Sequence, residues 1–504
     1  ASGNSVAAMW SWAELADGGR NRNTDGGARK ESRCAPREPS CHVREGVNGT
    51  APHRRLSARR AGLLGLIAGL LALLYAMNFG AIRLLTGAEG ADLFFAYPAF
   101  FAVVFLAYLA GVRLTWFAGR RVAVAVILLG VLFRLCMFPT PVVLSSDLYR
   151  YFWDGRVQLA GINPYRFSPE APELADLRDS DVHPRVNRPW ARTVYPPGAQ
   201  MLFAVLATIT PDRLWALRGM LTAFELLAML ALLAILRRLG LPEGRVAVYA
   251  WAPLPIFEFA QAGHIDAVVI PLVLGALLAV GAGRPGLAGG LLGGAALIKL
   301  YPAALLPVLW KRGDRRLPLA FFATVTLGYL PYAWGAGWKV VGFLPVYFAR
   351  FEEFNIGLRA LLTDAIGFTG DAARFFVSGL LASLLIGVLV ALGRSRGNTL
   401  PNLAAATGTA VGAYLLLLPS SIHPWYVVWL IPFLVVLPEP GWWYLTAAVA
   451  LSYVAYTEDP ARVPVWALVV EYLPAYLGVV LGFRHVRRRP AWSAENACQS
   501  EVAS

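Results

Sequence analysis

The sequence predicts an all-α protein that crosses a membrane many times, with about 12–14 membrane helices. Of its 504 residues, 57% are hydrophobic and only 15% are charged, which is too little charge to cover a soluble protein of this length. Apolar runs long enough to cross a hydrocarbon core of ~30 Å recur along residues 61–485. The 16 tryptophans and 19 tyrosines suit the headgroup level of a bilayer, where amphipathic rings collect.

The net charge of +14 reports membrane topology rather than a nucleic-acid partner. Lysine and arginine gather in tails and short loops between the apolar runs, which is the positive-inside pattern. The four cysteines show no CxxC spacing and no pairing across one face, so neither a disulfide framework nor a zinc site is supported.

The first third of the chain brings a polar loop to the outside. Residues 1–60 are polar and without periodicity, so we predict a disordered cytoplasmic tail. Arginines just before residue 61 place the start of the first span, 61–85, inside. Spans at 91–112 and 122–144 follow, and the third delivers an outer loop at 145–197.

The middle of the chain contains apolar segments of unequal length. Residues 199–210 are too short to span a bilayer and predict an interfacial or re-entrant helix. The next spans are predicted at 214–236, 246–262 and 265–282.

Residues 285–310 carry Lys299 in an otherwise apolar run. As one span, this run would place the basic sequence 311–316 outside. Two short legs that break at Lys299 keep both basic ends inside, and such breaks are tolerated where they line a cavity. We therefore predict a broken hairpin whose tip lies near the outer surface.

The last part of the chain repeats the pattern. Residues 335–374 form a second large outer loop and 486–504 a cytoplasmic tail, so both termini are expected in the cytoplasm. The remaining spans are predicted at 317–334, 375–392, 403–419, 427–437, 442–456 and 463–483.

This topology, which was set by the basic residues of loops and tails, gathers other polar side chains on the outer face. These side chains did not serve to set the topology, so their common location on one face indicates a functional site there. They are Asp147, Asp154, His264, Asp266, Lys299, Glu352 and His423.

The polar stretch 145–165 predicts a short helix on which Asp147, Tyr151 and Asp154 share one face. Arg150 and Asp154 stand four residues apart, so a structural salt bridge explains that pair. Asp147 has no such partner nearby. A carboxylate at the outer end of a span suits a general base that must reach a substrate hydroxyl.

The motif DLYRYFWDGR at 147–156, followed by GINPY at 161–165, resembles bacterial GT-C glycosyltransferases that use polyprenyl-phosphate sugars, in particular mannosyltransferases of the glycosyltransferase family 87 type. The resemblance covers roughly residues 60–485. Further pieces similar in kind and order are YPP at 195–197, GHID at 263–266, KLYP at 299–302 and HPWY at 423–426.

The resemblance implies a GT-C fold and an inverting transfer of a hexose, with mannose expected, from polyprenyl phosphate to a lipid- or cell-wall-linked glycan at the outer face. It implies that an acidic residue of the first outer loop is the catalytic base, and Asp147 stands there. Many members carry two adjacent acids at this place, whereas here Ser146 precedes Asp147. No cofactor and no metal are expected, because a lipid monophosphate donor in that family requires neither.

The departing phosphate needs cationic donors, and a lysine inside an apolar run tends to face a cavity or a partner. Lys299 is the first candidate, with snorkelling to the interface as the alternative. Arg192, Arg350 and Arg359 are further candidates, since arginine binds phosphate in bidentate fashion.

Substrate binding is assigned to a wider set of outer-face residues, with alternatives left open. His264 and Asp266 either bind acceptor hydroxyls or cap a helix, and residue type alone also allows a metal site with His423. The His423 and Trp425 pair either binds sugar or anchors the interface. The set is Tyr151, Asp154, Tyr195, His264, Asp266, Glu352, His423 and Trp425.

Two other functions remain as rivals. A transporter or flippase of lipid-linked saccharides would use the polar face as a gate, but such proteins commonly show paired interrupted helices in both halves. The motif at 147–165 has no second copy, which favours an enzyme. A glycan ligase would keep the fold and change the donor. The sequence does not identify the sugar, the linkage or the acceptor.

Overall fold

The computed structural model describes residues 56–349, 354–365, 367, 370–417, 421–437, 439–459 and 461–488. These residues form helices and connecting turns, with no strand among them, so the all-α prediction is confirmed. In chain order the α-helices are α1 (Ala58–Thr86), α2 (Asp92–Thr115), α3 (Arg120–Cys136), α4 (Asp147–Leu159), α5 (Pro197–Ile209), α6 (Leu214–Arg238), α7 (Ala247–Ala250), α8 (Pro253–Pro255), α9 (Val269–Gly281), α10 (Pro285–Ile298), α11 (Leu306–Leu309), α12 (Arg316–Ala336), α13 (Leu344–Ala349), α14 (Leu358–Ala360), α15 (Asp371–Ser395), α16 (Leu400–Leu417), α17 (Pro424–Val427), α18 (Pro440–Ala448) and α19 (Val465–Arg488).

Short 3-10 and π segments connect the α-helices. They are η3 (Pro172–Leu177), η4 (His183–Arg185), η5 (Glu243–Val246), η6 (Ile256–Gln261), η7 (Ile265–Val268), η8 (Tyr301–Leu305), η9 (Gly337–Val341), η10 (Leu361–Ala365), η11 (Val428–Val435) and η12 (Val449–Thr457).

Seven helices in the described part of the chain are long and apolar enough to cross a membrane, or eight if one bent pair is a single span. A multi-pass membrane protein is therefore supported. The sequence predicted about 12–14 membrane helices. The structure has fewer long helices because some predicted spans are divided into short helices. The run predicted at 427–437, for example, becomes α17 and η11, which contains Pro432, a residue without a backbone N–H donor.

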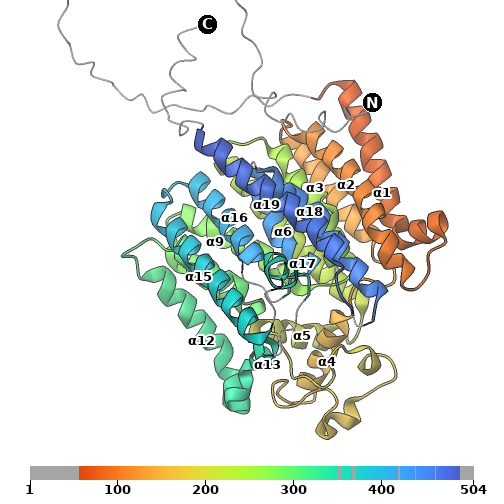
Figure 1. The fold of residues 1–504 in the computed structure, drawn as a ribbon, viewed down its shortest axis with the longest axis vertical. Helices are drawn as coiled ribbons and strands as arrows, with labels where there is room; N and C mark the ends of the chain where they lie inside the picture. The colour runs from red at the N-terminus through yellow and green to blue at the C-terminus, as the bar shows by residue number, and fades with distance from the viewer. Residues whose placement is uncertain are drawn as a thin grey trace, which may run out of the picture. The chain divides into compact units, whose positions relative to one another are not determined.

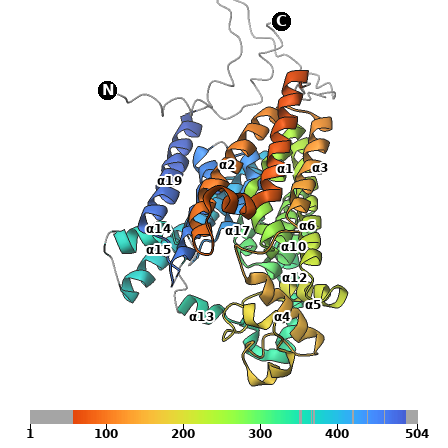
Figure 2. The same ribbon diagram turned by 90° about the vertical axis from the view of Figure 1, so that its right-hand side faces the viewer.

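The elements predicted to belong to outer loops lie at the end of the scaffold opposite the start of α1 and the end of α19. In Figures 1 and 2, α1 begins and α19 ends at the upper end of the helical scaffold. Helices α4, α5 and α13 lie at the lower end in both views. The break at Lys299 is confirmed, because α10 stops at Ile298 and the backbone of Lys299 is extended.

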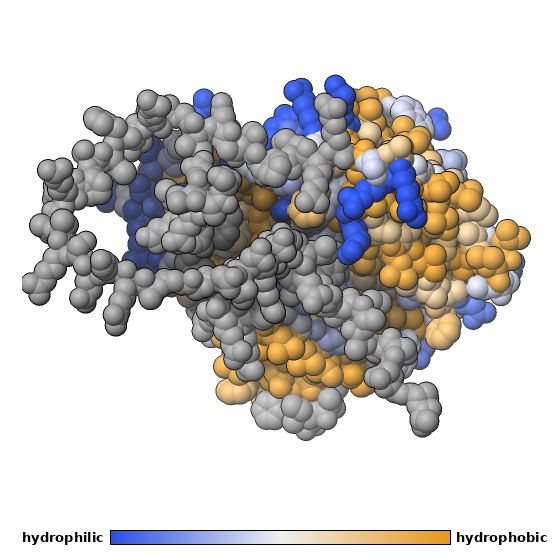
Figure 3. All heavy atoms as spheres, turned by 90° about the horizontal axis from the view of Figure 1, so that it is seen from above, coloured by the Kyte–Doolittle hydropathy of each residue, from blue (hydrophilic) through white to orange (hydrophobic). Residues whose placement is uncertain are grey.

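Exposed apolar side chains cover the flanks of the long helices. Leu66, Leu128 and Leu319 keep 73%, 65% and 65% of their surface exposed. Figure 3, seen from the end at which α1 begins, shows hydrophobic residues over broad parts of the visible surface. A soluble monomer rarely exposes so much contiguous apolar surface, whereas hydrocarbon tails cover it readily.

Small residues allow the closest helix contacts. A Cβ added to Gly289 on α10 would lie 2.1 Å from the carbonyl oxygen of Leu317, and one added to Gly293 would lie 2.9 Å from that of Phe321. The glycine-rich stretch of α10 thus packs directly on α12, as small-xxx-small spacing predicts.

A buried ion pair joins α3 to α6. The guanidinium of Arg134 contacts the carboxylate of Glu225 and also donates to the carbonyl oxygens of Gly130 and Ala250. Both side chains are fully buried. Charges inside a membrane scaffold are tolerated when they are paired in this way.

Candidate active site

Asp147 is the first residue of α4. Its backbone N–H donates to the hydroxyl of Ser145, and the amide of Asn187 donates to its Oδ1 at 2.6 Å. The side chain keeps 20% of its surface exposed. One carboxylate oxygen is thus held by Asn187, while the group stays within reach of a substrate.

The rest of the predicted α4 face is buried and holds α4 in place. Arg150 donates to Asp154 at 2.8 Å, which confirms the predicted pair, and Gln200 of α5 donates to the other carboxylate oxygen. Tyr151 stacks on Phe203 of α5 with a centroid distance of 4.6 Å. Asp154 and Tyr151 therefore join α4 to α5.

A sharp bend presents His264. The helical segments Pro253–Gln261 and Ile265–Gly281 are bent by 114° relative to one another. Gly263 has a φ of +85°, a left-handed value that favours glycine, and the N–H of His264 donates to the carbonyl oxygen of Glu258. The fully buried imidazole then lies with Nδ1 3.7 Å from Oδ2 of Asp147.

Arg218 of α6 secures this bend. Its guanidinium donates to the carbonyl oxygen of Gln261 just before the bend. It also donates to three carbonyl oxygens of the turn after α3, at Met137, Phe138 and Thr140. One buried arginine thus ties the end of α3 to the segment that carries His264.

Lys299 projects from the break after α10 into the same region. Its Nζ lies 3.2 Å from Oδ2 of Asp266, and the indole of Trp429 donates to Oδ1 of the same carboxylate. The ammonium also lies 5.7 Å from the ring centroid of Tyr195 and 5.1 Å from that of Tyr426. Aromatic faces attract a cation at such distances.

Trp425 lies between two histidines. Its rings stack on His264 at 3.7 Å and on His423 at 4.2 Å, and Phe354 covers the far face of His423. Both faces of the indole are therefore covered, and stacking of Trp425 on a sugar would require one imidazole to move. Among the described residues, no three His, Cys, Asp or Glu side chains are arranged so that they could hold a metal ion.

Two positively charged side chains, Lys299 and Arg188, lie near His423. Burial, with smaller contributions from the charges of Lys299 and Arg188, lowers the pKa of His423 to about 3. The ring is neutral at ordinary pH. Arg188, whose φ of 46° is left-handed, thus belongs to the neighbourhood of the site.

Tyr195 lies near both Asp147 and Lys299. Burial and the charge of Asp147 raise the pKa of Tyr195 well above its usual value. Its ring is also one of the two beside the Lys299 ammonium. Asp147, His264, Asp266, Lys299 and His423 are therefore parts of one cluster.

The remaining predicted cations lie elsewhere or cannot be placed. Arg192 lines a surface cavity of about 560 Å³ together with Arg166 and Lys339, and its guanidinium lies 5.8 Å from the ring centroid of Trp338. Arg350 and Glu352 fall outside the described residues.

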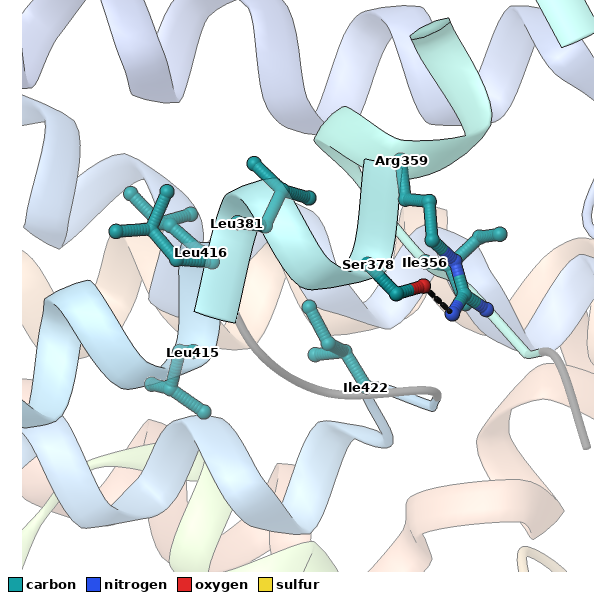
Figure 4. Close-up of a pocket in the computed structure, with 8 residues that line it drawn as sticks. Ile356, Arg359, Ser378, Leu381, Leu415, Leu416 and Ile422 are labelled. Atoms are coloured by element: carbon teal, nitrogen blue, oxygen red, sulfur yellow. Dashed lines mark hydrogen bonds between the residues drawn. The ribbon is translucent and has the colours of Figure 1, made fainter. Parts of the chain in front are cut away.

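Arg359 is 5% exposed and lines a small cavity of about 10 Å³. Figure 4 shows its guanidinium pointing toward the hydroxyl of Ser378, to which it donates at 3.1 Å. The other lining side chains are Ile356, Leu381, Leu415, Leu416, Leu417 and Ile422.

Sequence reasoning missed four residues of the cluster: Asn187, Arg188, Glu258 and Trp429. Glu258 carried a usable signal, because an acidic residue in an apolar run is costly and tends to be functional. Asn187 and Arg188 lie in an irregular loop, where no periodicity marks them. Trp429 looked like an ordinary apolar residue of its segment.

Residues 193–421 match the model of glycosyltransferase family 87. The match covers less than half of the chain, and it includes Asp266 and Lys299 but neither Asp147 nor His423. It supports glycosyltransferase activity, which requires a sugar donor and a glycan acceptor. No curated protein and no solved structure matches the chain.

Proposed function

We propose that this protein is an inverting GT-C-type glycosyltransferase at the outer face of a bacterial inner membrane. It transfers a hexose, mannose in this proposal, from polyprenyl phosphate to a lipid- or wall-linked glycan. The family 87 match supports the reaction class. The arrangement of charges in the cluster and the sequence resemblance support the donor, and the resemblance supports the acceptor and the stereochemistry.

One observation carries the proposal: the cluster leaves a carboxylate and an ammonium accessible. Asp147 keeps 20% and Lys299 keeps 15% of the side-chain surface exposed. Asp266, His264 and Glu258 are fully buried. A base and a cation that both reach a substrate are what transfer from a phosphate leaving group needs.

Asp147 is the general base. Asn187 holds Oδ1 and leaves Oδ2 to take the proton of the acceptor hydroxyl. That oxygen attacks the anomeric carbon from the face opposite the phosphate, and the bond between the anomeric carbon and the phosphate oxygen breaks with its electron pair on the lipid phosphate. Positive charge develops at the anomeric carbon in between, as in other glycosyl transition states.

The cationic side stabilises the departing phosphate. Lys299 is held by Asp266 and by the rings of Tyr195 and Tyr426, so its ammonium is positioned before the donor arrives. Arg188 adds positive charge near His423. Arg192 lies in the cavity with Arg166 and Lys339, where it suits a charged part of a substrate farther from the reacting centre.

The test is transfer activity of Asp147→Asn in membranes supplied with radiolabelled polyprenyl-phosphate mannose and native lipid acceptors. Loss of a general base lowers kcat by roughly 10²- to 10⁴-fold. Asp181→Asn is the matched control, because Asp181 belongs to the same outer segment and its side chain is 71% exposed. Full activity of Asp147→Asn at normal expression would overturn the assignment. Activity only with another lipid-phosphate sugar would keep the mechanism and change the donor.

A further inference from the structure

Asp147 is the outermost member of a row of three titratable groups. Nδ1 of His264 lies 3.7 Å from Oδ2 of Asp147, and Nε2 of the same ring lies 3.7 Å from Oε2 of Glu258. The exposed fraction falls from 20% at Asp147 to zero at His264 and Glu258. The row therefore runs from the accessible carboxylate into the interior.

His264 is a fully buried polar side chain at the centre of this row. Neither ring nitrogen has a hydrogen-bond partner among the described residues, although the side chain is fully buried. Buried polar atoms without partners are unfavourable, and each one needs an explanation. The stack on Trp425 and the turn at Gly263 hold the ring so that one nitrogen lies near each carboxylate.

Glu258 occupies an unusual place for a carboxylate. It lies in the π-helix η6, and both of its oxygens accept from the hydroxyl of Tyr453, at 2.9 and 3.0 Å. π-helical turns occur frequently at functional sites. An acidic side chain in an apolar segment is costly, and uptake of a proton removes the cost of its charge.

We propose that His264 and Glu258 form a proton relay behind Asp147, an inference that rests on the proposed transferase function. His264 starts neutral, with its proton on Nε2, and Glu258 starts as a carboxylate whose two oxygens accept from Tyr453. Asp147 takes the acceptor proton and passes it to Nδ1, while the Nε2 proton passes to Oε2 of Glu258. Asp147 is again a carboxylate, and Glu258 holds one proton as the carboxylic acid.

The relay resets when the proton returns through His264 to Asp147 and leaves with the lipid phosphate. One proton moves in each direction, so charge and atoms balance. The two gaps of 3.7 Å are longer than hydrogen bonds, and catalytic hydrogen bonds are often long before substrate binds. The other titratable groups near His264 are Lys299 and His423, of which His423 is neutral at ordinary pH.

The decisive variant is Glu258→Gln, which keeps the volume and can still accept from Tyr453 but cannot take a proton. We expect kcat to fall roughly 10- to 100-fold, with KM for donor and acceptor and the melting temperature unchanged. Glu471→Gln is the matched control, because Glu471 is also a fully buried carboxylate and accepts from the amide of Asn355, outside the row; its kcat should stay within about threefold. Wild-type kcat in Glu258→Gln would overturn the relay.

A measurement on the wild-type enzyme tests the relay even where the variant fails to fold. Transfer rates in mixtures of H₂O and D₂O should curve with deuterium fraction, because more than one proton moves in the step. A straight line, which indicates one proton, would overturn the relay. If Asp147→Asn is inactive while Glu258→Gln is normal, the relay fails and the proposed function stands. If the wild type transfers no sugar, the proposed function itself fails.

Discussion

Nζ of Lys299 lies 3.2 Å from Oδ2 of Asp266, and this contact joins the break after α10 to the segment that follows the bend at His264. The carboxylate is fully buried, while the lysine keeps 15% exposure. Asp266 therefore holds the ammonium in place from the buried side, and the exposed part of the lysine stays available to a substrate. The two breaks in the helical scaffold meet at this ion pair.

The first prediction concerns this lysine. Lys299→Met removes the cation expected at the departing phosphate, and a charge-assisted hydrogen bond contributes about 1.5–3 kcal/mol. We expect KM for the polyprenyl-phosphate donor to rise roughly 10- to 100-fold. Initial rates over a donor titration measure it.

A second variant separates donor binding from folding. Lys299→Met alone leaves the Asp266 carboxylate buried without its cation, which destabilises a protein. The double variant Asp266→Asn with Lys299→Met restores the charge balance, so its melting temperature should recover while donor KM stays high. Recovery of donor KM in the double variant would place the phosphate role elsewhere.

Arg218→Met should lower the melting temperature by several degrees. The change leaves four backbone carbonyl oxygens without their charged donor, one of them next to the bend at His264. We also expect a lower kcat, because the bend presents His264 to Asp147. Arg213→Met on the exposed turn before α6 is the control for loss of a positive charge. Equal melting temperatures for the two variants would contradict this role of Arg218.

Acid should destabilise the protein through His423. Its pKa of about 3 in the folded state lies below the usual value of ~6.5, so the unfolded chain binds the proton first as the pH falls. Stability from the neutral ring is fully present above about pH 6.5 and falls by about 2 kcal/mol at pH 5.

His423→Phe keeps a stacked ring and removes the titration. The drop in melting temperature between pH 7 and pH 5 should therefore be smaller in His423→Phe than in the wild type. His183→Phe, in the segment between α4 and α5, is the control for replacing a histidine by phenylalanine and should show the wild-type drop. An unchanged drop in His423→Phe would show that another group governs acid sensitivity.

The contact between α4 and α5 is predicted to control the position of Asp147. A Cβ added to Gly155 would lie 2.6 Å from the carbonyl oxygen of Phe203, so Gly155→Ala forces the two helices apart. We expect reduced kcat and reduced stability. Gly219→Ala on α6, where a Cβ meets nothing within 4 Å, should be neutral or slightly stabilising. Activity and melting temperature equal to the wild type in Gly155→Ala would contradict a tight α4–α5 contact.

The sequence by itself determined the features that depend on near neighbours in the chain. The length of apolar runs predicted a multi-pass membrane protein but not the number of its long helices. The basic loops predicted the break at Lys299, and the spacing of Arg150 and Asp154 predicted their ion pair. These follow from helical geometry and from the cost of burying charge, both of which act locally.

Only the tertiary structure decided what surrounds Asp147. Asn187 is 40 residues away along the chain, and Glu258 reaches the base only through His264. Trp425 meets His264 from a segment near the far end of the chain. Such contacts depend on how bends, breaks and close helix packing bring distant segments together, and no local periodicity encodes that arrangement.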